Sequence, residues 1–240
     1  MEISNKSLPT RSQAKITVMF VRFFRWLSNA AFTLLSTRKI KGLENIPPQG
    51  PYILVSNHLS RVDAPLLLTV IKNNNVTGWA AAKYRTHPLF GLIVRLGGGI
   101  FIRRGEVDRE PLSAGVAWLR EGNIFGIAAE GTRSKTGVLI RAKTGAAYLA
   151  DQAKVPILPI AIMGTESMMS NLLRLRRSRL AVHIGVPFYL PPLQEKERTV
   201  GLRRNADEIM CRIAAMMPPA YHGAYADHPR LGELLSESDA

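Results

Sequence analysis

Polar side chains recur at helical spacing within the otherwise apolar segment 12–36. Their separations of seven, three, four, four and three residues place them along one stripe of a helix. The polar stripe consists of Lys15, Arg22, Arg25, Asn29, Thr33 and Ser36, and the apolar positions around it include Phe20, Phe23, Phe24, Leu27, Leu34 and Leu35. The pattern predicts an amphipathic helix with one cationic side.

The uncharged part of this helix decides how we expect it to meet a membrane. Its longest uncharged stretch, 26–37, has twelve residues, whereas a spanning helix needs about 20. A secretory signal core would fit this length, but the polar stripe runs through it. We interpret the segment as a helix that lies in a membrane interface. The alternative is a helix that packs on the core of its own domain.

Beyond residue 40, short apolar runs alternate with helical stretches. The runs predict strands at 52–56, 76–82, 99–102, 124–129, 155–162 and 180–186. The helical stretches are 65–72, 107–121, 141–152 and 202–217. This alternation indicates an α/β domain. Because proline cannot donate a hydrogen bond to a neighbouring strand, Pro156 and Pro159 predict that 155–162 is an edge strand or a bulged segment.

Composition narrows the class of protein. Apolar residues make up 46% and charged residues 21%, which is typical of a globular chain. The net charge of +14 predicts an anionic partner, such as nucleic acid, an anionic membrane or a phosphorylated substrate. No five like charges are consecutive, so the sequence has no basic nucleic-acid-binding arm. The single cysteine, Cys211, excludes an internal disulfide and a multi-cysteine metal site.

The densest group of arginines lies in segment 172–180. Arg174, Arg176, Arg177 and Arg179 alternate there with leucines. Arginine beside leucine, without aromatic residues, favours a membrane interface over a platform for stacked bases. A solvated arginine-rich edge strand remains the alternative interpretation.

His58 and Asp63 lie between a predicted strand and a predicted helix. His58 follows run 52–56 directly, and Asp63 opens the next helix. In α/β folds, functional groups lie where strands lead into helices. The two side chains can meet only if His58 is in the loop and Asp63 is at the helix start, because residues five apart on one helix diverge by about 140°. The carboxylate could then hold one imidazole nitrogen and leave the other as a base. A loop histidine that caps backbone is the alternative. His222 and Asp227 share the spacing, but they lie in a polar region after two prolines.

Two further segments carry candidate binding groups. A glycine turn at 97–99 leads into a short strand that ends at Arg103 and Arg104, which alternation directs to opposite faces. After run 124–129 come Glu130, Gly131, Thr132 and Arg133, and Lys143 can add a cation near the same end of the sheet. Glutamate can accept from a hydroxyl, glycine allows close backbone approach, and arginine suits phosphate. The alternatives are a tight turn with surface arginines and a polar turn with an ion pair.

The sequence lacks the residue patterns that a serine hydrolase or a histidine metal site would need. No Gly-x-Ser-x-Gly elbow occurs, so a serine nucleophile of that type is absent from the sequence. The remaining histidines, His87, His183 and His228, are scattered and do not predict a metal site.

Four motifs occur together in one order. They are Asn57-His58-x4-Asp63, Gly99-Ile100-Phe101-Ile102-x-Arg104, Glu130-Gly131-Thr132-Arg133 and Val155-Pro156-Ile157-x-Pro159. With these motifs the chain resembles the 1-acylglycerol-3-phosphate acyltransferases, the PlsC-like branch of the glycerolipid acyltransferases. The resemblance extends from about Lys39 to Tyr225.

The resemblance implies a fold and a division of the chain. We expect one α/β glycerolipid-acyltransferase-like domain, with a central mixed sheet flanked by helices. An N-terminal amphipathic helix would associate with the membrane. The expected divisions are a membrane-binding segment at 1–38, the acyltransferase domain at 39–225 and a polar acidic tail at 226–240.

The resemblance also implies an activity. A fatty acyl group would pass from acyl-carrier protein or coenzyme A to a lysophospholipid hydroxyl. The expected acceptor is 1-acylglycerol-3-phosphate, which would give phosphatidic acid, with no cofactor, metal or nucleic acid involved. His58 would be the general base and Asp63 its orienting partner. The acceptor would be bound by Arg104, Glu130, Gly131, Thr132, Arg133 and Lys143. An anionic membrane would be a further partner, and we expect the protein at the cytoplasmic face of the cell membrane, peripheral or monotopic.

Several positions depart from the family's usual residues without removing the expected catalytic pair. They are Leu59, Arg61, Arg103, Ala128, Ala129 and Ala142. These differences leave open which head group the acceptor carries and which acyl chain length is transferred. A glycolipid or ornithine lipid acceptor is therefore an alternative, although it would leave Arg104 and Arg133 without a phosphate. A non-catalytic basic protein that binds membrane or nucleic acid is the other alternative, and it would need neither His58 nor Asp63.

Overall fold

The computed structural model describes residues 11–103 and 109–238. These residues include a seven-stranded sheet in the order β1-β7-β6-β2-β5-β3-β4. Strands β6, β2, β5, β3 and β4 are parallel to one another, β7 is antiparallel to β6, and β1 is parallel to β7. The mixed α/β sheet expected from the sequence is confirmed.

The elements follow one another with short connections. The strands are β1 Ser36–Lys41, β2 Tyr52–Ser56, β3 Val76–Ala81, β4 Ile100–Ile102, β5 Ile124–Ala128, β6 Ile157–Met163 and β7 Ser178–Ile184. The helices are α1 Arg11–Leu35, α2 Asp63–Val70, α3 Pro88–Leu96, α4 Arg109–Arg120, α5 Gly145–Ala153, α6 Met168–Leu173, α7 Arg198–Ala215 and α8 Pro229–Ser238. The sequence pattern did not predict β1, α3, α6 or α8.

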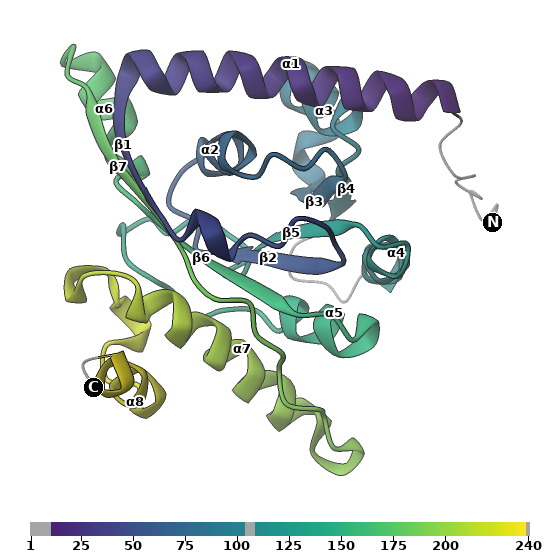
Figure 1. Ribbon diagram of the computed structural model, residues 1–240, viewed down its shortest axis with the longest axis vertical. Helices are drawn as coiled ribbons and strands as arrows, with labels where there is room; N and C mark the ends of the chain where they lie inside the picture. Colours follow the sequence, from purple (N-terminus) through teal and green to yellow (C-terminus); the bar gives the residue numbers. More distant parts are fainter. Residues whose placement is uncertain (1–10, 104–108, 239–240) are drawn as a thin grey trace.

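Helices cover both faces of the sheet (Figure 1). Alternate residues of β2 point to opposite faces. Ile53 and Val55 join a buried cluster with residues of α4, α5 and α7. Tyr52 and Leu54 join a second cluster with α2 and with Phe32 of α1. Burial on both sides explains why β2 reads as a continuous apolar run.

Strand β6 lies inside the sheet, between β7 and β2, so the prediction of an edge strand is wrong. Ile157 faces Phe188 whereas Ile160 faces Ile184, which leaves one extra residue on the returning chain. The carbonyl of Pro159 accepts from the Gly185 N–H at 2.9 Å, so Pro159 faces this irregular step. Its missing N–H therefore does not interrupt the ladder to β2.

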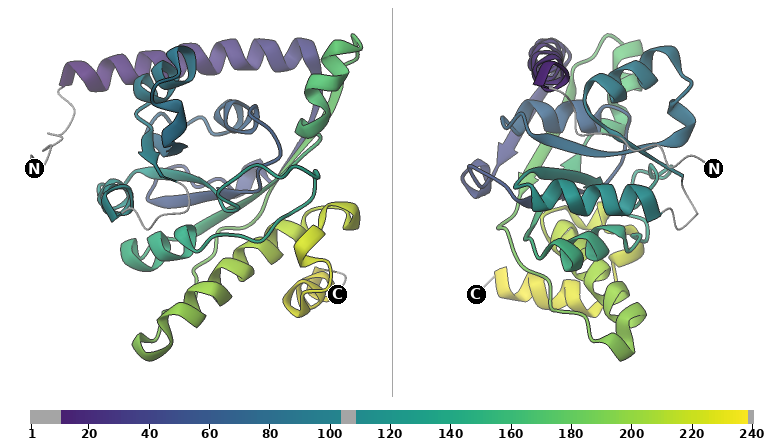
Figure 2. Two further views of the ribbon diagram at one scale, coloured as in Figure 1. Left: turned by 180° about the vertical axis from the view of Figure 1, so that it is seen from behind. Right: turned by 90° about the vertical axis from the view of Figure 1, so that its right-hand side faces the viewer.

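Helix α1 packs one face on α2 and lies across one end of the molecule (Figures 1 and 2). Val21 and Phe32 are buried. Arg25 donates to the carbonyl oxygens of Leu68 and Asn73 at 2.8 Å and to Asn74 Oδ1 at 2.9 Å. Arg25 thus belongs to the packed face and not to a solvated stripe.

The opposite face of α1 is apolar and exposed. Its large side chains are between 47% and 74% exposed, namely Ile16, Met19, Phe23, Trp26, Leu27 and Leu34. The part Ile16–Leu35 is also long and apolar enough to cross a membrane, by length and composition alone. The twelve-residue uncharged stretch therefore understated the apolar character of this helix.

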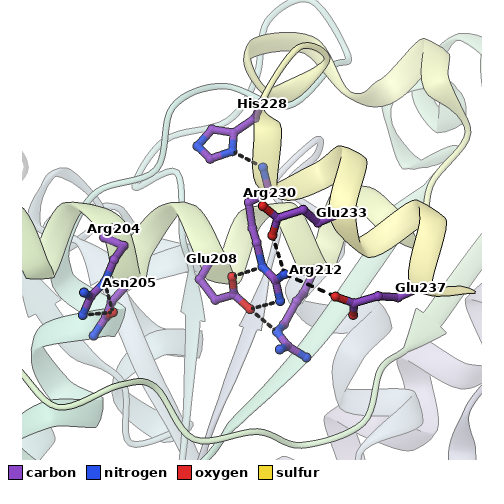
Figure 3. A network of polar contacts seen from close by, with 8 residues as sticks. All are labelled: Arg204, Asn205, Glu208, Arg212, His228, Arg230, Glu233 and Glu237. Carbon is purple, nitrogen blue, oxygen red and sulfur yellow. Dashed lines mark hydrogen bonds and ion pairs between the residues drawn. The ribbon is translucent and has the colours of Figure 1, made fainter.

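The segment after residue 226 contains α8, which packs on α7. Leu231 is buried. Arg230 joins the two helices, with its guanidinium 2.7 Å from Glu208 of α7 and 2.7 Å from Glu233 of α8 (Figure 3). Arg212 contacts the same Glu208 at 2.6 Å. Charged residues that make this segment polar in composition therefore hold α8 on α7.

Candidate active site

The candidate groups meet because β2 and β5 are parallel neighbours. Ser56, the last residue of β2, pairs with Ala128, the last residue of β5. His58 and Glu130 each follow their strand by two residues, so both lie at the carboxyl edge of the sheet. The backbone N–H of His58 points to Glu130 Oε1 at 3.4 Å, which joins two motifs that are far apart in the sequence.

His58 and Asp63 form the contact that their spacing predicted. Their Nδ1 and Oδ2 atoms are 2.8 Å apart. His58 lies in the loop after β2, and Asp63 is the first residue of α2. The imidazole is 19% exposed and the carboxyl only 3%, so a buried carboxylate orients a ring that a ligand can reach. Within the described chain, no hydrogen-bond partner occupies Nε2.

Asp63 is fixed by three further donors. Its Oδ2 accepts from the backbone N–H groups of Leu59 and Ser60, both at 2.8 Å. Its Oδ1 accepts from the Thr165 hydroxyl at 2.6 Å. Together these donors hold the orientation of the carboxyl toward His58.

Thr165 was missed in the sequence analysis. It follows the carboxyl end of β6, which runs parallel to β2, and its side chain is buried. The available signal was a hydroxyl residue just after the apolar run 155–162, a run that was interpreted as an edge strand or a bulged segment and in which no candidate site residue was named. Asn57 adds a second link, because its side-chain amide both donates to and accepts from the Ile162 backbone at 2.8 Å.

Glu130 is buried beside this pair. Its Oε2 has no hydrogen-bond partner among the described residues. Burial raises the pKa of Glu130 to about 8; the N–H of His58 opposes this shift and the negative charge of Asp63 adds to it. The carboxyl is therefore largely protonated at neutral pH, so it can donate a hydrogen bond as well as accept one.

The remaining residues of the motif form a turn next to His58. The Ser134 N–H donates to the His58 carbonyl at 2.8 Å, which holds the turn against the loop that carries His58. Gly131 has φ +67°, and a Cβ there would lie 3.1 Å from Lys143 Cγ, so glycine admits the Lys143 stem. Arg133 is half-buried, and the described residues offer its guanidinium no partner. Thr132 and Lys143 are exposed.

Two further predictions concern Arg104 and the second histidine–aspartate spacing. Arg104 lies outside the described residues, while Arg103 is exposed after β4. His222 is buried, and its Nε2 lies 3.0 Å from the Met217 carbonyl oxygen. In the described chain no hydrogen bond joins His222 to Asp227, so the second histidine–aspartate spacing does not form a pair.

The raised pKa of Glu130 predicts a pH-dependent stability. The folded pKa of about 8 exceeds the ordinary value of 4.5. Between these values the folded state binds more protons than the unfolded state, so the free energy of unfolding falls as pH rises. Glu130→Gln should remove this fall, which amounts to at most about 1.4 kcal/mol per pH unit. Urea unfolding from pH 5 to 8 measures it, with exposed Glu44→Gln as control. Parallel pH curves for wild type and Glu130→Gln would contradict a raised pKa.

Comparisons with known proteins converge on this region. The family model described as Acyltransferase matches residues 37–163. Human 1-acyl-sn-glycerol-3-phosphate acyltransferase beta is 33% identical over 155 residues, covering 63% of this chain and 53% of the human protein. The enzyme of the same name from Saccharomyces cerevisiae is 31% identical over 138 residues, covering 55% and 45%. The chain spans about half the length of the curated relatives it matches.

A solved structure shares the fold. The crystal structure of the 1-acyl-sn-glycerophosphate (LPA) acyltransferase PlsC from Thermotoga maritima superposes with a TM-score of 0.60 at 26% identity. The match covers 80% of this chain and 77% of that one. The family match contains His58, Asp63, Glu130 and Arg133, whereas Thr165 lies just beyond its end.

Proposed function

The chain belongs to the acyltransferase family, and we propose that it transfers a fatty acyl group from a thioester to the free hydroxyl of a lysophospholipid. The carrying observation is the 2.8 Å contact between His58 Nδ1 and the buried Asp63 carboxylate. This contact leaves Nε2 as the nitrogen available to a substrate. A basic protein that only bound membrane or nucleic acid would have no use for a fixed, reachable imidazole.

The mechanism is a direct transfer. Neutral His58 accepts the hydroxyl proton at Nε2 while the hydroxyl oxygen attacks the thioester carbonyl carbon. The carbon–sulfur bond then breaks, and the proton passes from the imidazolium to the leaving sulfur. Asp63 holds Nδ1–H and balances the transient positive charge. A positioned base contributes about 10²–10⁴ in rate, so substrate orientation must supply the rest.

The acceptor is proposed to be 1-acylglycerol-3-phosphate, and the donor acyl-carrier protein or coenzyme A thioester. Support comes from the names of the relatives and from Arg133, whose half-buried guanidinium lacks a described partner beside the catalytic loop. A planar guanidinium is suited to phosphate oxygens. Lys143 and Arg104 are proposed to add positive charge, and protonated Glu130 can donate to an acceptor oxygen.

The direct test is product identification. The protein is incubated with acyl-carrier protein or coenzyme A carrying a labelled acyl chain, together with a panel of lysolipids. Labelled phosphatidic acid from 1-acylglycerol-3-phosphate supports the proposal. Label transferred only to a glycolipid or ornithine lipid would replace the proposed acceptor, and release of label to no acceptor would refute acyl transfer to lipids.

Arg133→Ala should raise KM for the phosphorylated acceptor more than KM for the acyl donor. Loss of one charge-assisted hydrogen bond costs about 1.5–3 kcal/mol, or roughly 10–150-fold. Steady-state kinetics with each substrate varied in turn measures the difference. Lys72→Ala is the control, because it removes an exposed cation just after the far end of α2 from Asp63. Equal changes in both KM values would assign Arg133 to the donor or to structure.

We further propose that α1 associates with the cytoplasmic face of the membrane through its exposed apolar face, without crossing it. Three hydrogen bonds from Arg25 and the buried Val21 and Phe32 hold its other face on the domain. Crossing the bilayer would detach this face, although Ile16–Leu35 has the length and composition for it.

Replacing the stacked pair Phe23 and Trp26 with serine should reduce binding to lipid vesicles at least tenfold. Their ring centroids are 6.2 Å apart, and the side chains are 59% and 65% exposed. Insertion of an aromatic side chain contributes about 1.5–3 kcal/mol. Flotation with vesicles measures the loss, and Val200→Ser, 67% exposed on α7, is the control. Helix α7 lies on the other side of the sheet from α1 (Figure 1). Unchanged flotation of the double variant would remove α1 as the contact.

A further inference from the structure

Helix α6 and the turn that joins it to β7 expose large apolar side chains. Leu175 is 94% exposed, Leu173 79% and Met169 66%. At the base of the turn, Asn171 Nδ2 lies 3.2 Å from the buried Ser178 Oγ. The turn is therefore a fixed projection with apolar side chains at its tip.

Leu175 occupies a backbone conformation that normally selects glycine. Its φ is +54°. The Leu175 N–H donates to Leu172 O at 3.0 Å and the Arg176 N–H to Asn171 O at 2.8 Å, which is the helix-ending arrangement in which glycine usually holds this position. A Cβ is unfavourable there. A fully exposed leucine contributes nothing to the core that would offset this strain, so the side chain has another use.

Positive charge surrounds this tip. The described residues provide no hydrogen-bond or ion-pair partner for the side chains of Arg174, Arg176 and Arg179. Segment 168–180 contains no Asp or Glu. Arg177 instead donates to the carbonyl oxygens of Thr33 and Ser36, at 2.7 and 2.6 Å, and so joins the turn to the end of α1.

The turn lies at the same end of the molecule as α1 and α3 in all three views (Figures 1 and 2). Leu34, near the joined end of α1, is 74% exposed. In α3, Leu89 and Leu92 are 59% and 51% exposed. Three separate elements that carry exposed apolar side chains thus lie at one end of the fold, and the α6–β7 turn among them also carries unpaired arginines.

We propose that the α6–β7 turn is a second membrane-docking element, in which Leu173 and Leu175 insert among the acyl chains and Arg174, Arg176 and Arg179 bind phosphates of anionic lipids. Apolar insertion and unpaired arginines together fit an anionic lipid surface, since a protein partner would also need acidic groups at matching positions. The proposal extends the membrane association proposed for α1, and binding can be measured without catalysis.

Leu175→Gly tests the proposal. If Leu175 stabilised the fold, the variant would lower the thermal midpoint; if Leu175 inserts into the membrane, the variant should lower vesicle binding instead. Glycine relieves the positive φ, so the thermal midpoint should rise by about 2–4 °C. Flotation of the full chain with phosphatidylglycerol-containing vesicles should fall about tenfold. Lys154→Gly is the matched control, because Lys154 also has positive φ, at +55°, where it ends α5. It should lose no flotation.

Further variants separate this proposal from its rivals. Arg174→Gln with Arg176→Gln should reduce flotation on anionic vesicles but not on phosphatidylcholine vesicles, and His58→Ala should float like wild type. Normal flotation of Leu175→Gly and Leu173→Ser would overturn the proposal. A change in oligomeric state without a change in flotation would assign the turn to contacts between copies of the chain, which also overturns it.

Discussion

His58→Ala is expected to reduce acyl transfer by about 10²–10⁴-fold while leaving the fold intact. The variant removes the only group proposed to accept the hydroxyl proton. Apart from the imidazole contact with Asp63, the contacts of residue 58 come from its backbone, because its N–H points to Glu130 and its carbonyl accepts from Ser134. Asp63 also keeps its bonds from Leu59, Ser60 and Thr165. Initial rates with a labelled donor, together with thermal midpoints, measure the two effects.

A second histidine provides the control for this variant. His222 is buried and contacts the Met217 carbonyl oxygen, so His222→Ala should lower the thermal midpoint without removing transfer. Removal of a buried polar contact costs about 1–3 kcal/mol. Transfer at wild-type rate by His58→Ala would overturn the proposed mechanism, whatever the behaviour of His222→Ala.

The parts of the site that the sequence predicted depend on buried strands. β2 and β5 are apolar on both faces, so their runs and the polar residues that follow them are visible in the sequence. The parallel pairing of Ser56 with Ala128 then brings His58 and Glu130 together. The arrangement needs only that the carboxyl ends of parallel strands meet at one edge of a sheet.

The parts that the sequence did not predict depend on which strands are neighbours. Thr165 approaches Asp63 because β6 lies next to β2, whereas two prolines had indicated an edge strand or a bulged segment. Proline excludes a residue from pairing only on the side to which its nitrogen points, and Pro159 faces the irregular step beside β7. Whether a strand that contains proline can lie inside a sheet therefore depends on where in the strand the proline lies.

Helix α1 shows a similar limit. Helical spacing correctly places Arg25 with other polar residues, but it cannot distinguish solvent from the carbonyl oxygens at the end of α2. Strand β1 was missed because Ser36–Lys41 has charged residues on the exposed side of an edge strand. Such a short alternating segment carries little apolar signal.

Asp63→Asn should reduce acyl transfer by about 10²–10⁴-fold with little loss of stability. Asparagine can keep its carbonyl oxygen where Oδ2 accepts from Leu59 and Ser60, both at 2.8 Å. Its amide then faces the Thr165 hydroxyl, which can rotate to accept. Orientation is largely retained, but the negative charge that balances the imidazolium is lost. Kinetics and urea unfolding separate these effects, with Asp151→Asn, which loses its ion pairs to Lys154 and Arg198, as control.

The double variant gives the sharper test, because Asp63 is proposed to act only through His58. His58→Ala combined with Asp63→Asn should be no slower than His58→Ala alone, since the carboxylate has no base left to assist. Thr165→Val, which removes one of the four donors to Asp63, should lose about tenfold or less and only when His58 is present. Additive losses in the double variant would mean that Asp63 acts on the substrate or on the fold independently of His58.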